Sequence, residues 1–336
     1  MITHLYFSNK QKNELLKIFN TVKTSPYTDY KEFKREVSNL VVSNLVPLFF
    51  SEACDQIKKE RENAGINAHV LHNMPLDEVI PVFDHMDPVN DKYLKKKTFI
   101  GETLLELFSQ LTNSPLLAYR TRNNGDFFHD VYAHKRYQNT QTQKTDGELF
   151  FHNDRTAHPV RADFLSLLGM RCCQKNHIYT GYIDGKSILE HLSVESQYWL
   201  RMPLYITPFD EYSKDSNQTQ IDSEKHAILE NIHTFRYYDT RTIYVHNAPI
   251  EAVKALVELK SAMTKAKKEH IAINTGDLFS FANQDSLHNR EIIKINDPDN
   301  AEKRWLLKTY SFRDANEMNK YNSYFQDDLP GYVVSE

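Results

Sequence analysis

Three residues have the chemical types and the local setting to bind one metal ion. His152 and Asp154 follow an apolar segment expected to be a strand, and positions i and i+2 of a strand share a face. His288 comes far downstream, after a turn, a short apolar strand and a polar loop expected over residues 275–287. Two imidazoles and one carboxylate form the facial triad of non-haem iron(II) sites, which leaves positions open for a 2-oxo acid and O₂. We therefore expect an Fe(II) site at these three residues.

Two basic residues downstream of His288 have a spacing that suits anion binding. Arg304 stands at the start of a strand expected over residues 305–312, and its guanidinium can bind a carboxylate through two parallel hydrogen bonds. We expect Arg304 to bind the far carboxylate of 2-oxoglutarate. Lys308 has the same strand parity as Arg304, so both side chains are expected to face one cavity.

The elements that must position these residues are mainly short strands. Helical interruptions are expected around residues 188–198 and 250–267, and this pattern predicts a mainly β sandwich or jelly roll with helical decoration. The expected strands cover residues 66–70, 116–120, 131–137, 148–151, 162–170, 204–206, 233–238, 277–281 and 305–312. The polar segment 210–225 is expected to be a surface loop and a candidate lid.

The length suits one domain over residues 1–336, with a mainly helical part at 1–112 and a jelly-roll core at 113–320. The formal net charge of -4 argues against a nucleic-acid partner, because phosphate contacts require an excess of Lys and Arg. No phosphate-binding glycine motif, signal peptide or transmembrane segment is evident. The three cysteines do not suggest a disulfide framework, so a cytoplasmic location without a membrane partner is expected.

Two stretches around the metal-binding candidates resemble a known family. The first runs from Gly147-Glu148-Leu149-Phe150-Phe151-His152-Asn153-Asp154 through residues 157–168, and the second includes Gly276-Asp277-Leu278 before His288 and Arg304-Trp305-Leu306 after it. In order and spacing they resemble the clavaminate synthase-like Fe(II)/2-oxoglutarate dioxygenases, relatives of taurine dioxygenase, and most of all the free amino acid hydroxylases. The match covers the C-terminal two-thirds, and the N-terminal third matches only in its helical character.

This resemblance implies a double-stranded β-helix core, which is a cupin-like jelly roll, with the metal ligands at its mouth. It also implies hydroxylation of a free L-amino acid, coupled to decarboxylation of 2-oxoglutarate to succinate and CO₂. A basic side chain (Lys, Arg or ornithine) is the expected substrate feature, and a neutral amino acid such as Asn or Gln, or another small metabolite, stays open. Desaturation in place of hydroxylation and the oligomeric state are also open.

The resemblance further assigns roles to single residues. Thr180 falls where family members contact 2-oxoglutarate, and Thr142 and Gln143 fall where they contact the substrate backbone. Asp239 falls where they read the substrate side chain, and Lys308 where they bind the substrate carboxylate. No catalytic residue is expected beyond the metal ligands.

The chain departs from the family pattern at two of these positions. Asp154 stands where many amino acid hydroxylases have Glu, and Lys308 stands where relatives often have Arg. Lysine keeps the charge but loses the bidentate fork.

Two functions from other classes remain. A zinc hydrolase could use the same three ligands with a bound water, but Arg304 would then have no role. A non-catalytic jelly-roll binding protein with a vestigial site is less consistent with an intact set of His152, Asp154, His288 and Arg304.

Overall fold

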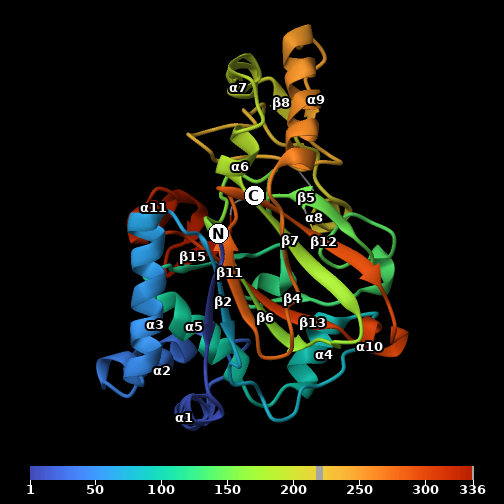
Figure 1. Ribbon diagram of the computed structural model, residues 1–336. Coiled ribbons are helices and arrows are strands. Elements are labelled where there is room, and N and C mark those ends of the chain that lie inside the picture. The colour runs from blue at the N-terminus through green and yellow to red at the C-terminus, as the bar shows by residue number, and fades with distance from the viewer. Residues whose placement is uncertain (217–221, 335–336) are drawn as a thin grey trace.

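The computed structural model describes residues 1–216 and 222–334, and it has two main β-sheets (Figure 1). The larger sheet has the order β1 (Thr3–Tyr6), β2 (Ala68–His72), β11 (Leu278–Ala282), β6 (Phe164–Arg171), β13 (Trp305–Ser311), β3 (Leu116–Tyr119), β15 (Leu329–Val333) and β14 (Phe325–Gln326), with β4 (His129–Val131) beside β13. The smaller sheet has the order β10 (Glu269–Ile271), β7 (His177–Asp184), β12 (Ser286–Lys294) and β5 (Leu149–His152). A separate ribbon pairs β8 (Tyr205–Ile206) with β9 (Ile243–Tyr244).

The two sheets face each other across an apolar interior. Tyr182 of the smaller sheet makes edge contacts with Phe279 and Phe281 of the larger one, at centroid distances of 6.4 and 5.9 Å. Leu165 and Leu167 of β6 belong to the same buried cluster. Alternation along each strand sends these residues inward, as packing of two sheets requires.

Helices cover the outer face of the larger sheet. They are α1 (Asn9–Phe19), α2 (Tyr30–Val42), α3 (Leu48–Lys59) with the π-helical turn η1 (Glu60–Ala64), α4 (Pro88–Lys95) and α5 (Ile100–Leu111). Ser8 and Gln11 form a capping box at the start of α1. Almost every residue of α5 is buried, because this helix lies between the sheet and the other helices.

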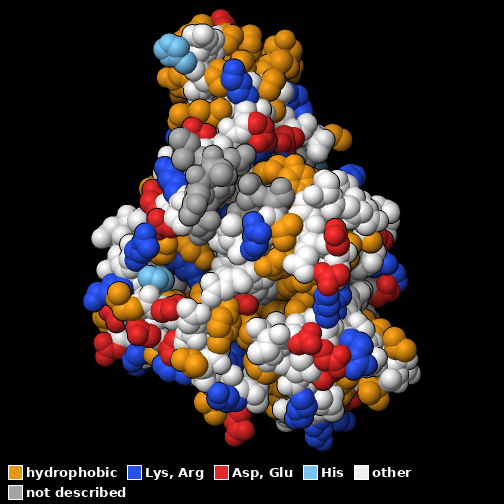
Figure 2. Space-filling model, turned by 180° about the vertical axis from the view of Figure 1, so that it is seen from behind, with side chains coloured by type: hydrophobic (Ala, Val, Ile, Leu, Met, Phe, Trp, Pro, Cys, Tyr) orange, Lys and Arg blue, Asp and Glu red, His pale blue; other side chains and the backbone are white. Residues whose placement is uncertain are grey.

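A second helical group projects from one end of the sandwich (Figure 1). It contains α6 (Gly185–Leu189), α7 (Val194–Leu200) and α9 (Ile250–Lys265). The short helix α8 (Glu211–Ser216) lies beside the sandwich, where Tyr212 contacts Asn123 and Tyr137. Two further short helices, α10 (Pro298–Glu302) and α11 (Ala315–Asn319), come late in the sequence. Figure 2 shows hydrophobic side chains gathered on this projection, where Val194, Ile250 and Val257 are exposed. Within residues 1–216 and 222–334, none of the helices combines the length and apolar character needed to cross a bilayer.

The expected elements match the structure unevenly. The strands expected at 116–120, 148–151, 162–170, 277–281 and 305–312 correspond to β3, β5, β6, β11 and β13. Residues 233–238 form only isolated bridges, and the strand expected at 131–137 ends at Val131. The sequence pattern missed β7 and β12, because both strands carry polar residues toward the interior.

Candidate metal centre

Strand pairing brings the two histidines together. β5 ends at His152, and β12 runs antiparallel to it with His288 directly opposite His152. Residues opposite each other on neighbouring strands hold their side chains close together, and the two imidazole centroids are 4.4 Å apart. His288 therefore lies within a strand, whereas the sequence suggested that it follows a loop.

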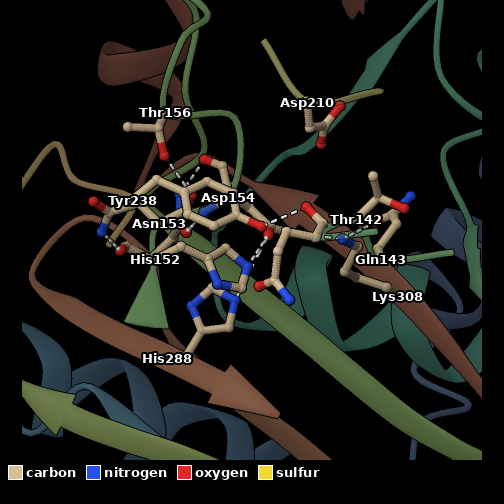
Figure 3. A network of polar contacts seen from close by, with 12 residues as sticks. Thr142, Gln143, His152, Asn153, Asp154, Thr156, Asp210, Tyr238, His288 and Lys308 are labelled. Atoms are coloured by element: carbon tan, nitrogen blue, oxygen red, sulfur yellow. Dashed lines mark hydrogen bonds and ion pairs between the residues drawn. The ribbon is translucent and has the colours of Figure 1, made fainter. Parts of the chain in front are cut away.

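Asp154 completes the group from just beyond the end of β5. Its Oδ1 lies 3.2 Å from Nε2 of His152 and 3.6 Å from Nε2 of His288. One ligand atom from each residue fits within 4.8 Å of the others (Figure 3). The three candidates from the sequence are thus brought to one point, with two nitrogen donors and one oxygen donor.

Surrounding groups hold these side chains in place. Nδ1 of His152 lies 2.7 Å from the carbonyl oxygen of Phe150, which directs Nε2 toward Asp154. The ring of Tyr238 stacks on His152 at 4.8 Å, and its hydroxyl donates to the carbonyl of Gln141. The backbone N–H of Asp154 donates to the Asn283 side chain at 2.8 Å. No pattern in the sequence pointed to Tyr238 or Asn283, although Tyr238 is the chain neighbour of the predicted Asp239.

Lys308 is bound to the free side of Asp154. Its buried ammonium lies 2.6 Å from Oδ2 of Asp154 and 2.9 Å from the hydroxyl of Tyr310, and it also donates to Oε1 of Gln143. Burial alone would raise the pKa of Asp154, but Lys308 and the two imidazoles hold it well below its usual range. Burial and the nearby His152 lower the pKa of His288 to about 4. Near neutral pH the site therefore offers an ionised carboxylate and a neutral His288, the forms that bind metals.

One cavity, the inner cavity, lies on the side of the metal centre between the two sheets. Its polar lining includes Thr180, Arg290, Arg304 and Lys308 together with the three candidate ligands, and its apolar wall includes Leu165, Leu167 and Leu306. Arg304, Leu306 and Lys308 alternate along the start of β13, as the predicted parity requires.

The two guanidinium groups of the inner cavity differ in their partners. Arg290, which is opposite Thr180 in the β7–β12 pairing, donates to the carbonyls of Thr145 (2.7 Å) and Gly147 (2.8 Å). Within the described part of the chain, the side chain of Arg304 has no hydrogen-bond or ion-pair partner. Its charge is therefore available to an anion that enters the cavity. Arg290 was not among the predicted site residues, because no local pattern distinguishes it.

A second cavity, the outer cavity, lies on the other side of the metal centre. It is bordered by Thr142, Gln143, Tyr238 and Asp210, and by three arginines, Arg122, Arg155 and Arg241. Arg122 pairs with Asp210 at 3.2 Å, and Arg241 pairs with Glu211 of α8. Because Gln143, His152 and Asp154 line both cavities, the metal centre stands between them.

The structure brings most predicted site residues to these cavities. Thr180, Arg304 and Lys308 line the inner cavity, and Thr142 and Gln143 line the outer one. Residues 211–216 of the predicted loop 210–225 form α8, and 217–221 lie outside the described residues.

Asp239 is the exception, because it lines neither the inner nor the outer cavity. Its carboxylate accepts from Tyr237 (2.7 Å) and pairs with Lys260 of α9 (3.0 Å). Alternating side chains in this extended segment send Tyr238 to the metal centre and Asp239 to the opposite face. The carboxylate that does border the outer cavity is Asp210.

No protein-family model matches the sequence, and no curated protein matches it. Several solved structures are similar to the chain. An asparagine oxygenase in complex with Fe(II), 2S,3S-3-hydroxyasparagine and succinate matches with a TM-score of 0.79 at 18% identity, covering 99% of both chains. The non-heme iron oxygenase OrfP in complex with Fe, succinate and (3S)-hydroxy-L-Arg matches with a TM-score of 0.77 at 16% identity, also covering 99% of both chains.

A further complex of OrfP, with Fe and alpha-ketoglutaric acid, matches with a TM-score of 0.75 at 17% identity and covers 94% of this chain and 96% of that chain. At such low identities the likeness establishes the fold. The predicted fold class, a jelly-roll core with helical decoration, is confirmed, and the chain shares it with solved non-haem iron oxygenases.

Proposed function

We propose that the protein is an Fe(II)- and 2-oxoglutarate-dependent oxygenase that hydroxylates a free L-amino acid. The observation that carries this proposal is the position of the candidate metal centre between two polar cavities, with the unpaired Arg304 in the inner one. One cavity suits the cosubstrate and the other the substrate, so both can reach the same metal ion. Two solved structures with the same fold contain a hydroxylated amino acid, 3-hydroxyasparagine in one and hydroxyarginine in the other, which agrees with an amino acid as the substrate here.

The donor set fits iron(II). Two imidazole nitrogens and one carboxylate oxygen are the ligands of the 2-His-1-carboxylate centre, and that centre retains open positions for a 2-oxo acid and O₂. His152, Asp154 and His288 would hold the ion. Bound there, iron would supply the oxygen chemistry, while the protein positions the reactants and tunes the charge around them.

The inner cavity fits 2-oxoglutarate. Arg304 and Thr180 would bind its far carboxylate, while the apolar side chains of Leu165, Leu167 and Leu306 would contact the carbon chain. A zinc hydrolase that uses the same ligands would leave the charge of Arg304 without a function. A non-catalytic binding protein would need neither this charge nor three intact ligands.

The outer cavity fits a polar amino acid. Thr142 and Gln143 would contact the substrate backbone, and Asp210, which lines this cavity where Asp239 does not, would contact the substrate side chain. A basic side chain (Lys, Arg or ornithine) would depend on Asp210, whose carboxylate already pairs with Arg122. A neutral amide side chain such as Asn or Gln needs no change in that pair. The charge of Asp210 therefore decides between the two classes.

Lys308 would act at the boundary between the cavities. Its bond to Asp154 means that a substrate carboxylate reaching Lys308 would share its ammonium with the metal ligand.

We also propose a cytoplasmic location. Cys54, Cys172 and Cys173 are all free thiols, as is usual in a reducing compartment.

The deciding experiment measures succinate formation from 2-oxoglutarate with the twenty free amino acids, in protein reconstituted with Fe(II). We expect at least one polar amino acid to stimulate succinate formation, and His288→Ala to abolish it while the protein stays folded. Anaerobic addition of 2-oxoglutarate to the Fe(II) protein should also produce a weak absorption at about 500 nm, a property of the metal–cosubstrate pair. A protein that forms no such absorption and consumes no 2-oxoglutarate with any amino acid would contradict the proposal.

A further inference from the structure

A third cavity, the basal cavity, lies apart from the metal centre. Its volume is about 320 Å³, and none of its lining residues borders the inner or the outer cavity. Its walls come from the end of α3 and η1, the start of β6, α6, the loop between β11 and β12, and the segment after β13. Basic side chains enter it from several of these elements: Lys58, Arg61, Lys186 and Arg313.

Arg61 has no acidic partner at this cavity. Its guanidinium lies 4.0 Å over the ring of Phe164 and donates to the hydroxyls of Ser280 (2.8 Å) and Ser114 (3.3 Å). Its Nε is enclosed and has no hydrogen-bond partner, and no carboxylate of the described chain forms an ion pair with it. Burial lowers the pKa of Arg61 to about 10, so the side chain stays charged at neutral pH. Arg61 is partly buried, and a charge withdrawn from water without a counter-ion is costly, which is why such groups are normally paired.

Two lysines add to this unpaired charge. The ammonium groups of Lys58 and Lys186 form no ion pair or hydrogen bond within residues 1–216 and 222–334. Lys186 extends from α6 to the end of η1, since a Cβ built on Gly65 would lie 2.8 Å from its Nζ. The cavity thus joins cations from two elements that are distant in the sequence.

The acidic residues of the basal cavity do not neutralise these cations. Asp285 accepts from Thr234 (2.6 Å) and lies 3.7 Å from Arg313, and Asp314 caps the start of α11. Arg313 also pairs with Asp163 at 3.1 Å. Of the lining carboxylates, only that of the exposed Glu62 has no partner among the described residues. Counted by ion pairs among the described residues, three cations (Lys58, Arg61 and Lys186) therefore stand against two carboxylates (Glu62 and Asp314).

We propose that the basal cavity binds a small multivalent oxyanion of the phosphate class. Guanidinium and ammonium groups form their strongest hydrogen bonds with anionic oxygens. The hydroxyl of Ser114 and the side chains of Asn67 and Thr112 supply further polar groups at the wall. The anion supplies the counter-charge that Arg61, Lys58 and Lys186 lack. Free phosphate and the phosphate group of a metabolite have this chemistry in common.

The test is phosphate binding by the full-length protein. Thermal unfolding and titration calorimetry are measured with inorganic phosphate against sodium chloride at equal ionic strength, and glycerol 3-phosphate serves as the second probe. An anion that binds only the folded state raises the melting temperature in a saturable way. We expect such a rise with phosphate, and tighter binding of glycerol 3-phosphate if the natural ligand is a phosphorylated metabolite.

Variants locate the binding site. Lys186→Gln and Arg61→Gln should each weaken phosphate binding by about tenfold or more, because each removes a charge-assisted contact. Lys186 is exposed, so its variant remains informative even if Arg61→Gln does not fold. Lys17→Gln, an exposed change on α1, and Arg304→Gln, in the inner cavity, should leave the binding unchanged. Absence of saturable binding, or binding that is lost in Arg304→Gln and retained in Lys186→Gln, would overturn the proposal.

Discussion

The ammonium of Lys308 lies 2.6 Å from Oδ2 of Asp154, the carboxylate whose other oxygen faces both His152 and His288. Both partners of this ion pair are largely buried, with 3% and 12% of their side-chain surfaces exposed. The pair links a predicted metal ligand to a predicted substrate-binding residue, so a change in either one acts on both.

The ion pair predicts strong coupling in the metal-free protein. Asp154→Asn or Lys308→Met leaves one buried charge unpaired, and each should lower the free energy of unfolding by about 3 kcal/mol. The double variant should be more stable than the sum of the single effects predicts. This double-mutant cycle is measured by urea unfolding of the wild type, the two single variants and the double variant, all in the presence of a chelator. Additive effects would show that the two side chains do not depend on each other.

Arg304 should determine affinity for the cosubstrate. Arg304→Ala removes a bidentate charged contact and should raise the dissociation constant for 2-oxoglutarate by about 10²-fold, with little change for the amino acid. Lys303→Ala is the matched control, since Lys303 is the chain neighbour of Arg304 but does not line the inner cavity. Titration calorimetry under anaerobic conditions gives both constants. Equal losses for the two ligands would contradict this assignment.

Asp210 and Asp239 form a matched pair of carboxylates for substrate recognition. Asp210→Asn changes the charge at the outer cavity and weakens the ion pair with Arg122, whereas Asp239 contacts Lys260 and Tyr237 away from that cavity. We expect Asp210→Asn to change the Michaelis constant of a basic substrate by roughly 10-fold or more, the worth of a charged hydrogen bond. Asp239→Asn should have little effect. The reverse result would restore the role that the sequence assigned to Asp239.

Glu102 should make stability depend on pH. Burial raises the pKa of Glu102 in α5 from 4.5 to about 7. The nearby Asp77 carboxylate adds to this rise, and the Lys96 ammonium opposes it. Between these values the folded state holds a proton that the unfolded chain releases, so stability falls as pH rises from about 4.5 to about 7. The loss attributable to this group is about 3 kcal/mol.

Glu102→Gln should remove most of this pH dependence, because the amide does not titrate. Its carbonyl can still accept the hydrogen bond from the Tyr27 hydroxyl, which is 2.5 Å long in the wild type. Urea unfolding at pH 5, 6 and 7 compares the two proteins, with the exposed Glu14→Gln as the control. A variant with the same slope as the wild type would show that another group titrates in this range.

Local pattern sufficed for part of the site. His152 and Asp154 were identified from their spacing at the end of an apolar strand, and Arg304 and Lys308 from their shared parity, because strand alternation depends only on nearby residues. The main strands β5, β6, β11 and β13 were predicted for the same reason. Strands β7 and β12 were not predicted. Their inward residues line a polar cavity and are themselves polar, so the usual alternation of apolar and polar residues is lost.

By itself, the sequence determined the residue types of the metal centre, the order of the motifs and the mainly β class. The tertiary structure decided which of these residues meet. The register of β12 against β5 places His288 opposite His152. The bridge between Tyr238 and His152 turns the next side chain, Asp239, toward α9, and Asp210 is the carboxylate at the outer cavity. It also collected Lys58, Arg61 and Lys186 around the basal cavity. Such contacts depend on long-range strand pairing and packing, which join segments that no local periodicity relates.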